Sequence, residues 1–160
     1  MRLPLLCIQA LMALCLGFCQ IAHAAEVSEG ERAQIRKLAD AQHAAQGRSD
    51  IPGMLAPLAH DARVSVQNAR ASLEFGRSGY EAYLNKYESR VPDLTQYKFQ
   101  RVNETFAYTP SGDGIVYTFF KKIQYVAKNK PVHLSQVHEW HLRKGPAGME
   151  IYKMVLERAR

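Results

Sequence analysis

Two stretches near the start of the chain carry apolar residues at helical spacing. The first opens with Ser28 and Glu31, a capping-box pattern, and continues to Gly47. Its apolar face comprises Ile35, Leu38, Ala41, Gln42 and Ala45. The second opens at Ser49–Pro52, because proline is tolerated in the first turn of a helix, and ends near His60. The pattern therefore predicts two helices before the first strand.

From residue 62 to residue 67 apolar and polar residues alternate, which indicates a half-buried strand. A second short strand is expected at Leu73–Phe75. Ser78 and Glu81 form another capping-box pattern and open a third helix, which continues to Val91, just before a proline. The first half of the chain thus combines three helices with two short strands.

The second half of the chain is strand-like throughout. Four long strands are predicted, at Thr95–Thr109, Ile115–Ala127, Val132–Arg143 and Met149–Glu157, and the turns between them contain glycine or asparagine. Such strands pair in order as an antiparallel meander. In the first of them the apolar positions change from odd to even numbers near residues 100–101, so we expect a β-bulge there and a sharply curved sheet.

The third long strand indicates which residues face the core. One face carries Val132, Leu134, Gln136, His138, Trp140 and Leu142, and the other carries His133, Ser135, Glu139 and His141. Together the elements predict an α+β domain in which three N-terminal helices pack on a strongly curved, mixed or antiparallel sheet of about six strands.

Residues 1–24 have the layout of a secretory signal peptide. A charged residue precedes an apolar run from Leu3 to Phe18, and two alanines at alternate positions precede Ala25. The run is shorter than the roughly 20 apolar residues of a membrane span. We therefore expect cleavage before Ala25, export to the bacterial periplasm or beyond it, no stable membrane span afterwards, and a single domain at residues 25–160.

The amino-acid composition argues against several kinds of site and partner. All three cysteines lie within residues 1–24, so the exported domain would have neither a disulfide nor a thiolate nucleophile or metal site. The formal net charge is +6 with the basic residues scattered, and with export this argues against a nucleic-acid partner. A basic surface suits an anionic partner in the cell envelope, although solubility alone explains it as well.

The histidines do not indicate a metal site. His133 and His141 share a face, but eight residues of extended strand separate them by about 26 Å, and His138 faces the other way. The sequence contains no Gly-x-Ser-x-Gly elbow and no glycine-rich phosphate loop. We therefore expect no metal and no cofactor.

Three segments carry a family resemblance: Leu55–Val64, which leads into the first strand, Gly76–Tyr83, which opens the third helix, and His138–Met154, which includes the last turn. With the order of the elements, they resemble the nuclear transport factor two-like superfamily, also described as SnoaL-like or ketosteroid-isomerase-like. The resemblance implies a cystatin-like cone whose wide end opens into a pocket for a small apolar ligand, for catalysis or for a protein partner. It also implies that a homodimer can form through the sheet.

Candidate site residues follow from this resemblance and from strand parity. They are Tyr97, Tyr117, Gln136, His138 and Trp140. His138 could serve there as an acid or base while tyrosines position a ligand, or the same residues could be hydrogen-bonded core. The isomerases carry a catalytic aspartate where this chain has Val66. Lys121, on an otherwise apolar face, could bind a ligand carboxylate or extend to solvent.

Three hypotheses for function remain. The first is an exported binding module that holds a small apolar ligand or a protein partner without catalysis, and the missing aspartate favours it. The second is a small isomerase, dehydratase or hydrolase that uses His138 and pocket tyrosines. The third is an assembly factor or inhibitor of a cell-envelope system that acts through the outer face of the sheet.

Overall fold

The computed structural model describes residues 26–68, 71–87, 97–127 and 130–158. In chain order the elements are α2 (Glu29–Gly47), α3 (Ile51–Leu55), β1 (Leu58–Gln67), β2 (Ser72–Gly76), α4 (Arg77–Tyr87), β3 (Lys98–Tyr108), β4 (Ile115–Ala127), β5 (Lys130–Gly145) and β6 (Gly148–Arg158). The α+β class and the predicted meander are confirmed. The expected signal peptide lies outside the described residues.

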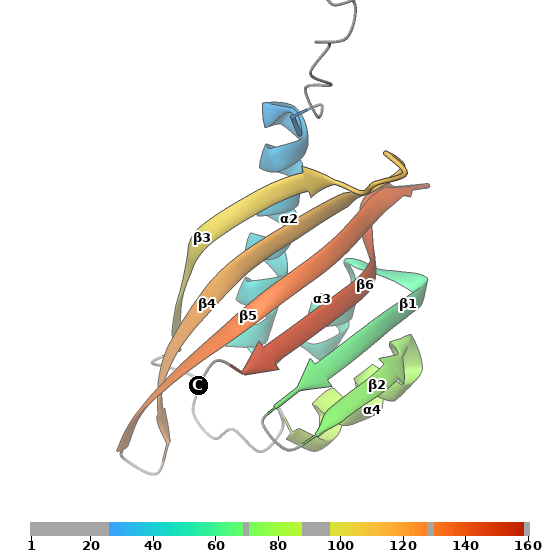
Figure 1. The fold of residues 1–160 in the computed structure, drawn as a ribbon. Coiled ribbons are helices and arrows are strands. Elements are labelled where there is room, and N and C mark those ends of the chain that lie inside the picture. Colours follow the sequence, from blue (N-terminus) through green and yellow to red (C-terminus); the bar gives the residue numbers. More distant parts are fainter. Residues whose placement is uncertain (1–25, 69–70, 88–96, 128–129, 159–160) are drawn as a thin grey trace, which may run out of the picture.

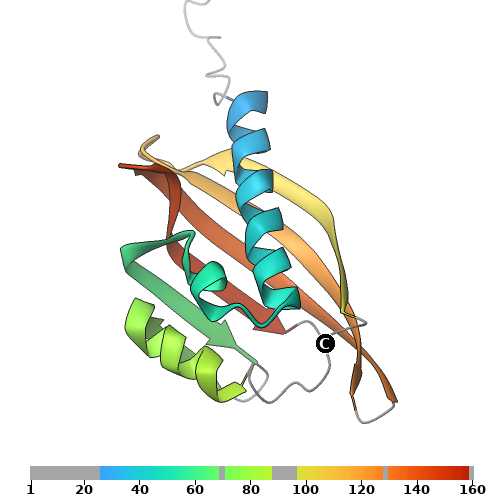
Figure 2. The ribbon, with the colours of Figure 1, turned by 180° about the vertical axis from the view of Figure 1, so that it is seen from behind.

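All six strands form one sheet, in the order β2-β1-β6-β5-β4-β3. β1 runs parallel to β6, whereas every other neighbouring pair is antiparallel, so the sheet is mixed. The sheet is curved, and the helices lie on one of its faces (Figures 1 and 2). α2 runs across this face, with α3 near its C-terminal end and α4 beside β1 (Figure 2).

The capping box of α2 is present as predicted. The Ser28 hydroxyl accepts a hydrogen bond from the Glu31 backbone N–H, and the Glu31 carboxylate accepts one from the Ser28 backbone N–H. The buried face differs from the expected one, because Ala41 is exposed and Leu38 is only partly buried. The helix instead buries Ile35, Ala39, Gln42, His43 and Ala45. The helix is rotated by a fraction of a turn, which brings a histidine into the core.

The boundary between α3 and β1 was predicted wrongly. α3 ends at Leu55 and β1 begins at Leu58, so His60 lies in the strand rather than at the end of a helix. The backbone N–H of Ile151 donates to the carbonyl oxygen of Pro57 at 2.8 Å. This long-range bond ties the chain to β6 directly after the helix, which local sequence patterns cannot reveal.

The start of α4 also differs from the prediction. The helix begins at Arg77, so Ser78 lies inside it rather than at its cap. Its predicted last residues, 88–91, and the predicted start of β3 at residues 95–96 lie outside the described part of the chain.

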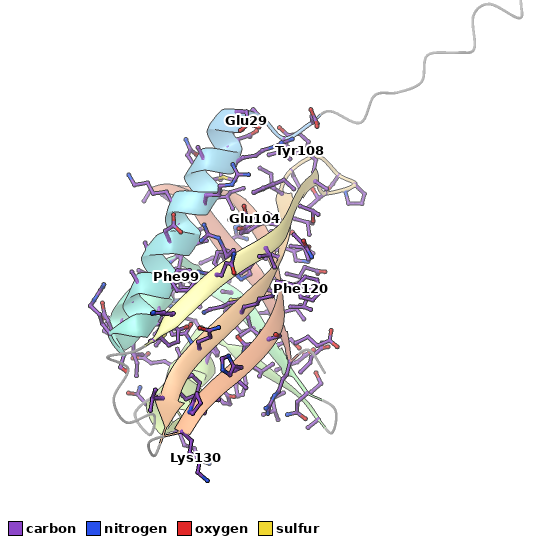
Figure 3. The ribbon with its side chains drawn as sticks, turned by 90° about the vertical axis from the view of Figure 1, so that its left-hand side faces the viewer. Glu29, Phe99, Glu104, Tyr108, Phe120 and Lys130 are labelled. Atoms are coloured by element: carbon purple, nitrogen blue, oxygen red, sulfur yellow. The ribbon has the colours of Figure 1, made fainter. Side chains whose placement is uncertain are left out.

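The predicted bulge in β3 is present, but it lies two to three residues later than expected. Val102 pairs with Phe120 and Thr105 pairs with Thr118, so β3 holds one extra residue between these pairs. Asn103 adopts a φ of 55°, in the left-handed region that Asn tolerates better than most residues. The bulge turns Glu104 toward α2, whereas Phe120 lies on the opposite side of the sheet (Figure 3).

The core lies between α2 and the sheet. Its largest fully buried side chains include Tyr117, Phe119, Trp140, Leu142 and Ile151, from the three central strands. The predicted inward parity of β4 and β5 is therefore confirmed. No helix in the described residues is both long and apolar enough to cross a membrane.

Candidate functional site

A cavity of about 250 Å³, called the α2–α4 pocket below, opens between the sheet and these two helices. Its apolar walls come from Met54 of α3, Val66 of β1, Leu84 of α4, and Met154 and Leu156 of β6. Because four different elements contribute these walls, the pocket exists only in the folded chain.

The polar lining of the pocket is mostly uncharged. Amide side chains line it at Gln42 and Gln46 of α2, at Gln67, which ends β1, at the following Asn68, and at Gln136 of β5. The other polar lining residues are Tyr80, Tyr83, His138 and Arg158. None of the lining residues within the described ranges is an aspartate or a glutamate. The pocket therefore suits a small molecule that has apolar surface and also forms several hydrogen bonds.

His138 is 5% exposed and stacks on Phe119, its cross-strand neighbour, with ring centroids 4.8 Å apart. Its Nε2 lies 3.2 Å from Oε1 of Gln136, and its Nδ1 has no hydrogen-bond partner among the described residues. Burial lowers the pKa of this imidazole well below its usual 6.5, and the charge of Lys121 lowers it further. His138 is therefore a neutral hydrogen-bonding group.

His43 of α2 lies next to His138 inside the core. It is 1% exposed, and its ring centroid is 6.1 Å from that of His138 and 4.5 Å from that of Phe99. Neither ring nitrogen of His43 has a hydrogen-bond partner among the described residues. Burial, together with the charge of Lys121, lowers the pKa of His43 far below 6.5, so this ring is neutral too.

Trp140 completes a group of three polar rings. It is fully buried, and its Nε1–H has no partner among the described residues. Its ring centroid lies 6.2 Å from His43 and 6.3 Å from His138. We call these three side chains the ring triangle. Only His138 of the triangle lines the α2–α4 pocket, and the other two rings lie next to it in the core.

Lys121 of β4 is buried beside this region, with 1% exposure. Its ammonium group donates a hydrogen bond to Oε1 of Gln46, a pocket residue, and lies 5.7 Å from the ring centroid of Phe99. It also pairs across the sheet with Gln136. The interpretation that Lys121 extends to solvent is therefore wrong, because helix α2 closes over this strand and an amide takes the place of water.

The structure brings together only part of the predicted site. Gln136 and His138 line the pocket, whereas Trp140 lies behind them in the core. Tyr97 lies just before β3, half-buried against Phe99 at a centroid distance of 6.3 Å, and is not a lining residue. Strand parity predicts which face of the sheet a side chain lies on, but it does not predict how deeply the side chain is buried. Trp140 and Tyr97 therefore lie outside the pocket lining although they were predicted to belong to it.

Tyr117 is the clearest correction, because it belongs to a separate polar group that we call the Glu104 cluster. Its hydroxyl donates to the Glu104 carboxylate, which also lies 3.2 Å from Nε of Arg36 and 3.3 Å from Nε of Arg101. Burial, and then the bond to Glu104, raises the pKa of Tyr117. Burial raises the pKa of Glu104, but its bonds to Tyr117 and the two arginines outweigh this, and the net shift is downward.

Sequence patterns missed several pocket residues. Gln42 and Gln46 are one helical turn apart, and the position of Gln42 on the predicted apolar face of the helix was the available signal. Gln42 is 8% exposed in the structure. Its amide donates to the carbonyl oxygen of Met54 at 3.3 Å. Tyr80 and Tyr83 of α4, which are not among the predicted site residues, line the pocket as well.

A larger hollow of about 780 Å³ lies at the opposite end of α2, where Glu31, Tyr108, Lys144 and Tyr152 help to line it. The Glu31 carboxylate already accepts hydrogen bonds from Ser28 and from the Tyr108 hydroxyl at 2.9 Å. Among its described lining residues, no buried polar atom lacks a partner. The α2–α4 pocket is therefore the stronger candidate site. The described residues also contain no group of three or more potential metal ligands.

Comparisons with known proteins give a clear result for the fold alone. No protein-family model matches the sequence, and no curated protein matches it. Among solved structures, a nuclear transport factor two-like protein with a cystatin-like fold from Novosphingobium aromaticivorans aligns with a TM-score of 0.65 at 14% identity. The alignment covers 97% of this chain and 90% of that protein.

Two further structures illustrate the range of this fold. A suggested dehydratase of the same family from Streptomyces avermitilis aligns with a TM-score of 0.67 at 15% identity, over 83% of this chain and 99% of its own. The CaMKII hub of S. rosetta aligns with a TM-score of 0.63 at 15% identity, over 78% of this chain and 94% of its own. This protein therefore has the nuclear transport factor two-like, cystatin-like fold that the sequence resemblance predicted.

Proposed function

We propose that this protein is an exported domain that binds a small, largely apolar molecule in the α2–α4 pocket without converting it. The observation that carries the proposal is the lining of the pocket. Aliphatic side chains and tyrosines line it together with amides and a histidine, and Arg158 is the one charged residue among its described lining residues. These residues include no carboxylate to serve as a base.

The state of the candidate base supports binding over turnover. Val66, at the position where the isomerases carry their aspartate, lines the pocket with an apolar side chain. The remaining base, His138, has a pKa well below 6.5, and such an imidazole abstracts protons poorly. In ligand binding, His138 then forms a directional hydrogen bond to the ligand.

Native mass spectrometry of the protein purified gently from periplasm tests the proposal. We expect the native mass to exceed the denatured mass by that of a retained small molecule. The denatured mass also reports whether residues 1–24 have been removed, which tests export separately.

Two leucine variants on the same strand locate the ligand. His138→Leu should lose the added mass, whereas His133→Leu, on the exposed opposite face of β5, should keep it. An empty wild-type protein, or an added mass that survives His138→Leu, contradicts the pocket as the site.

A catalytic role is the second candidate, and one observation favours it. His138 has a displaced pKa and lines the pocket together with Tyr80 and Tyr83, a combination common at active sites. The test is to incubate the identified ligand in deuterated water with wild type and with His138→Leu. Deuterium uptake or a mass change that needs His138 identifies an isomerase, dehydratase or hydrolase, and an unaltered ligand supports simple binding.

The outer sheet face supports a third candidate, association with a second copy or an envelope protein. Phe120 is 38% exposed there, and its cross-strand neighbours are Val102 and Val137. A small apolar row on an open sheet suits a partner surface. Sedimentation of wild type and of Phe120→Ser tests it, because a dimer built on this face should dissociate in the variant.

A further inference from the structure

The ring triangle has an unusual set of unpaired hydrogen-bonding atoms. Nδ1 of His138, both nitrogens of His43 and Nε1 of Trp140 have no hydrogen-bond partner among the described residues. All three side chains are at least nine-tenths buried, and each pair of ring centroids is 6.1 to 6.3 Å apart. Buried polar groups are almost always paired, so this cluster calls for a partner group.

The donor and acceptor roles in the triangle can be assigned. Oε1 of Gln136 can only accept, so Nε2 of His138 carries the proton and Nδ1 presents a lone pair. Trp140 can only donate. A neutral His43 provides one donor and one acceptor. The triangle therefore offers donors and acceptors together, which distinguishes it from an oxyanion-binding site made of donors alone.

The chemistry of common ligand groups can be compared with these roles. A carboxylate or a ketone oxygen only accepts hydrogen bonds, so it would leave the lone pair of Nδ1 unpaired and facing another lone pair. A hydroxyl group can accept from Trp140 or His43 and can donate to Nδ1 of His138. Alcohols and phenols therefore complement the triangle better than ketones or acids do.

Since His138 belongs to both the triangle and the pocket lining, a ligand in the pocket can present such a group to the triangle. We infer that the ligand of the α2–α4 pocket is an uncharged, largely apolar alcohol or phenol whose hydroxyl donates a hydrogen bond to His138. This inference rests on the proposed ligand-binding function and adds the chemical class of the ligand.

Trp140 provides the measurement, because it is the only tryptophan in the chain and belongs to the triangle. The purified full-length or processed protein is freed of any retained molecule and titrated with 4-tert-butylcyclohexanol, the matching ketone and the matching carboxylate, while tryptophan fluorescence is followed. We expect the alcohol to bind roughly tenfold more tightly than the ketone, the ratio that one added net hydrogen bond of ordinary strength provides. The carboxylate should also bind less tightly than the alcohol, because it cannot donate a hydrogen bond to Nδ1 of His138.

A variant series assigns the preference to His138. His138→Phe keeps an aromatic ring on β5 but removes the acceptor, so the alcohol should lose its advantage and bind about as well as the ketone. His133→Phe, on the opposite face of the strand, should preserve the wild-type ratio. If His138→Phe does not fold, the comparison of alcohol, ketone and carboxylate binding to the wild-type protein still tests the inference.

The outcomes separate this inference from the proposed function. If the ketone or the carboxylate binds as tightly as the alcohol, the inference is wrong and the pocket still binds ligands. If the alcohol preference persists in His138→Phe, the assignment to this residue is wrong. If none of the three probes binds, both the inference and the proposed pocket fail.

Discussion

Two polar groups, one partly buried and one fully buried, lie beneath the same helix, two turns apart, and they differ in how their polar atoms are paired. In the Glu104 cluster, near Arg36 of α2, one carboxylate contacts a tyrosine hydroxyl and two guanidinium groups. In the ring triangle, near His43 of the same helix, four ring nitrogens have no partner among the described residues.

The difference indicates separate roles. The Tyr117 hydroxyl donates to Glu104. Nε and Nη1 of Arg101 make no hydrogen bond among the described residues, but they form ion pairs with Glu104 and Asp40, so the charges of this cluster are paired and hold α2 on the sheet. The ring triangle adjoins a pocket and lacks partners, which costs stability in the unliganded protein and is expected where a ligand supplies the missing groups. Changes of pH and single substitutions in each group measure this difference.

The pH dependence of the free energy of unfolding should distinguish the ring triangle from the Glu104 cluster most strongly. The folded pKa values of His43 and His138 lie far below 6.5, so between pH 6.5 and pH 5 the unfolded chain binds protons that the folded chain does not. The free energy of unfolding that depends on these neutral histidines is fully present above pH 6.5. About 2 kcal/mol of it per histidine is lost by pH 5. Urea unfolding at a series of pH values measures the loss.

The Glu104 cluster should respond only at lower pH. The folded pKa of Glu104 is depressed, so the stability that its ionised form provides is present above its usual pKa of 4.5. This stability is lost as the pH falls through the lowered value.

The double variant His43→Leu/His138→Leu should remove most of the stability loss between pH 6.5 and pH 5. An unchanged slope in that variant would mean that the buried rings are not its source.

Glu104→Ala should cost about 2 kcal/mol of unfolding free energy at neutral pH. The change removes the acceptor of the buried Tyr117 hydroxyl and leaves the guanidinium groups of Arg36 and Arg101 without this carboxylate. Urea unfolding measures the loss, and Glu74→Ala on the exposed strand β2 is the matched control. Equal, small effects in both variants would show that the cluster does not stabilise the fold.

Gln136→Leu should cost about 1 kcal/mol, because it removes the acceptor of the His138 Nε2–H and leaves a further buried donor unpaired. Chemical unfolding of the unliganded protein gives the value. Ser135→Leu, at the exposed neighbouring position, provides the comparison. A neutral result for Gln136→Leu would contradict the assigned tautomer of His138.

His43→Leu should be nearly neutral or slightly stabilising in the unliganded protein at neutral pH. The change removes two unpaired buried nitrogens and adds apolar volume, so little is lost. The same unfolding assay tests this. A loss as large as that of Glu104→Ala would mean that His43 already has its partners in the unliganded protein, and the contrast between the two groups would disappear.

Local patterns predicted most of the fold. Alternation in β4 and β5 identified the buried face, including Tyr117, His138 and Trp140, because the two-residue period of a strand leaves little choice once one face is apolar. The bulge was predicted from the same parity. Its position was missed because Asn103 provides the left-handed residue, and parity alone does not show where one is tolerated.

The candidate site was predicted less completely. Gln136 and His138 are the two predicted residues that line the pocket, and strand parity and the family resemblance agreed on them. Tyr117 was misplaced because its partner, Glu104, comes from the bulge of a neighbouring strand. Gln42 was expected on the buried face of its helix but not as a pocket residue, and His43 was missed because that face is rotated from the expected one.

Short-range periodicity and turn residues were sufficient to predict most elements, their inward faces and their resemblance to a known fold. The depth of each inward side chain and the meetings between polar groups could be seen only in the folded chain. Depth depends on the curvature of the sheet and on the rotation of α2. The pairing of Tyr117 with Glu104, and the meeting of His43, His138 and Trp140, join residues from separate elements that no local pattern connects.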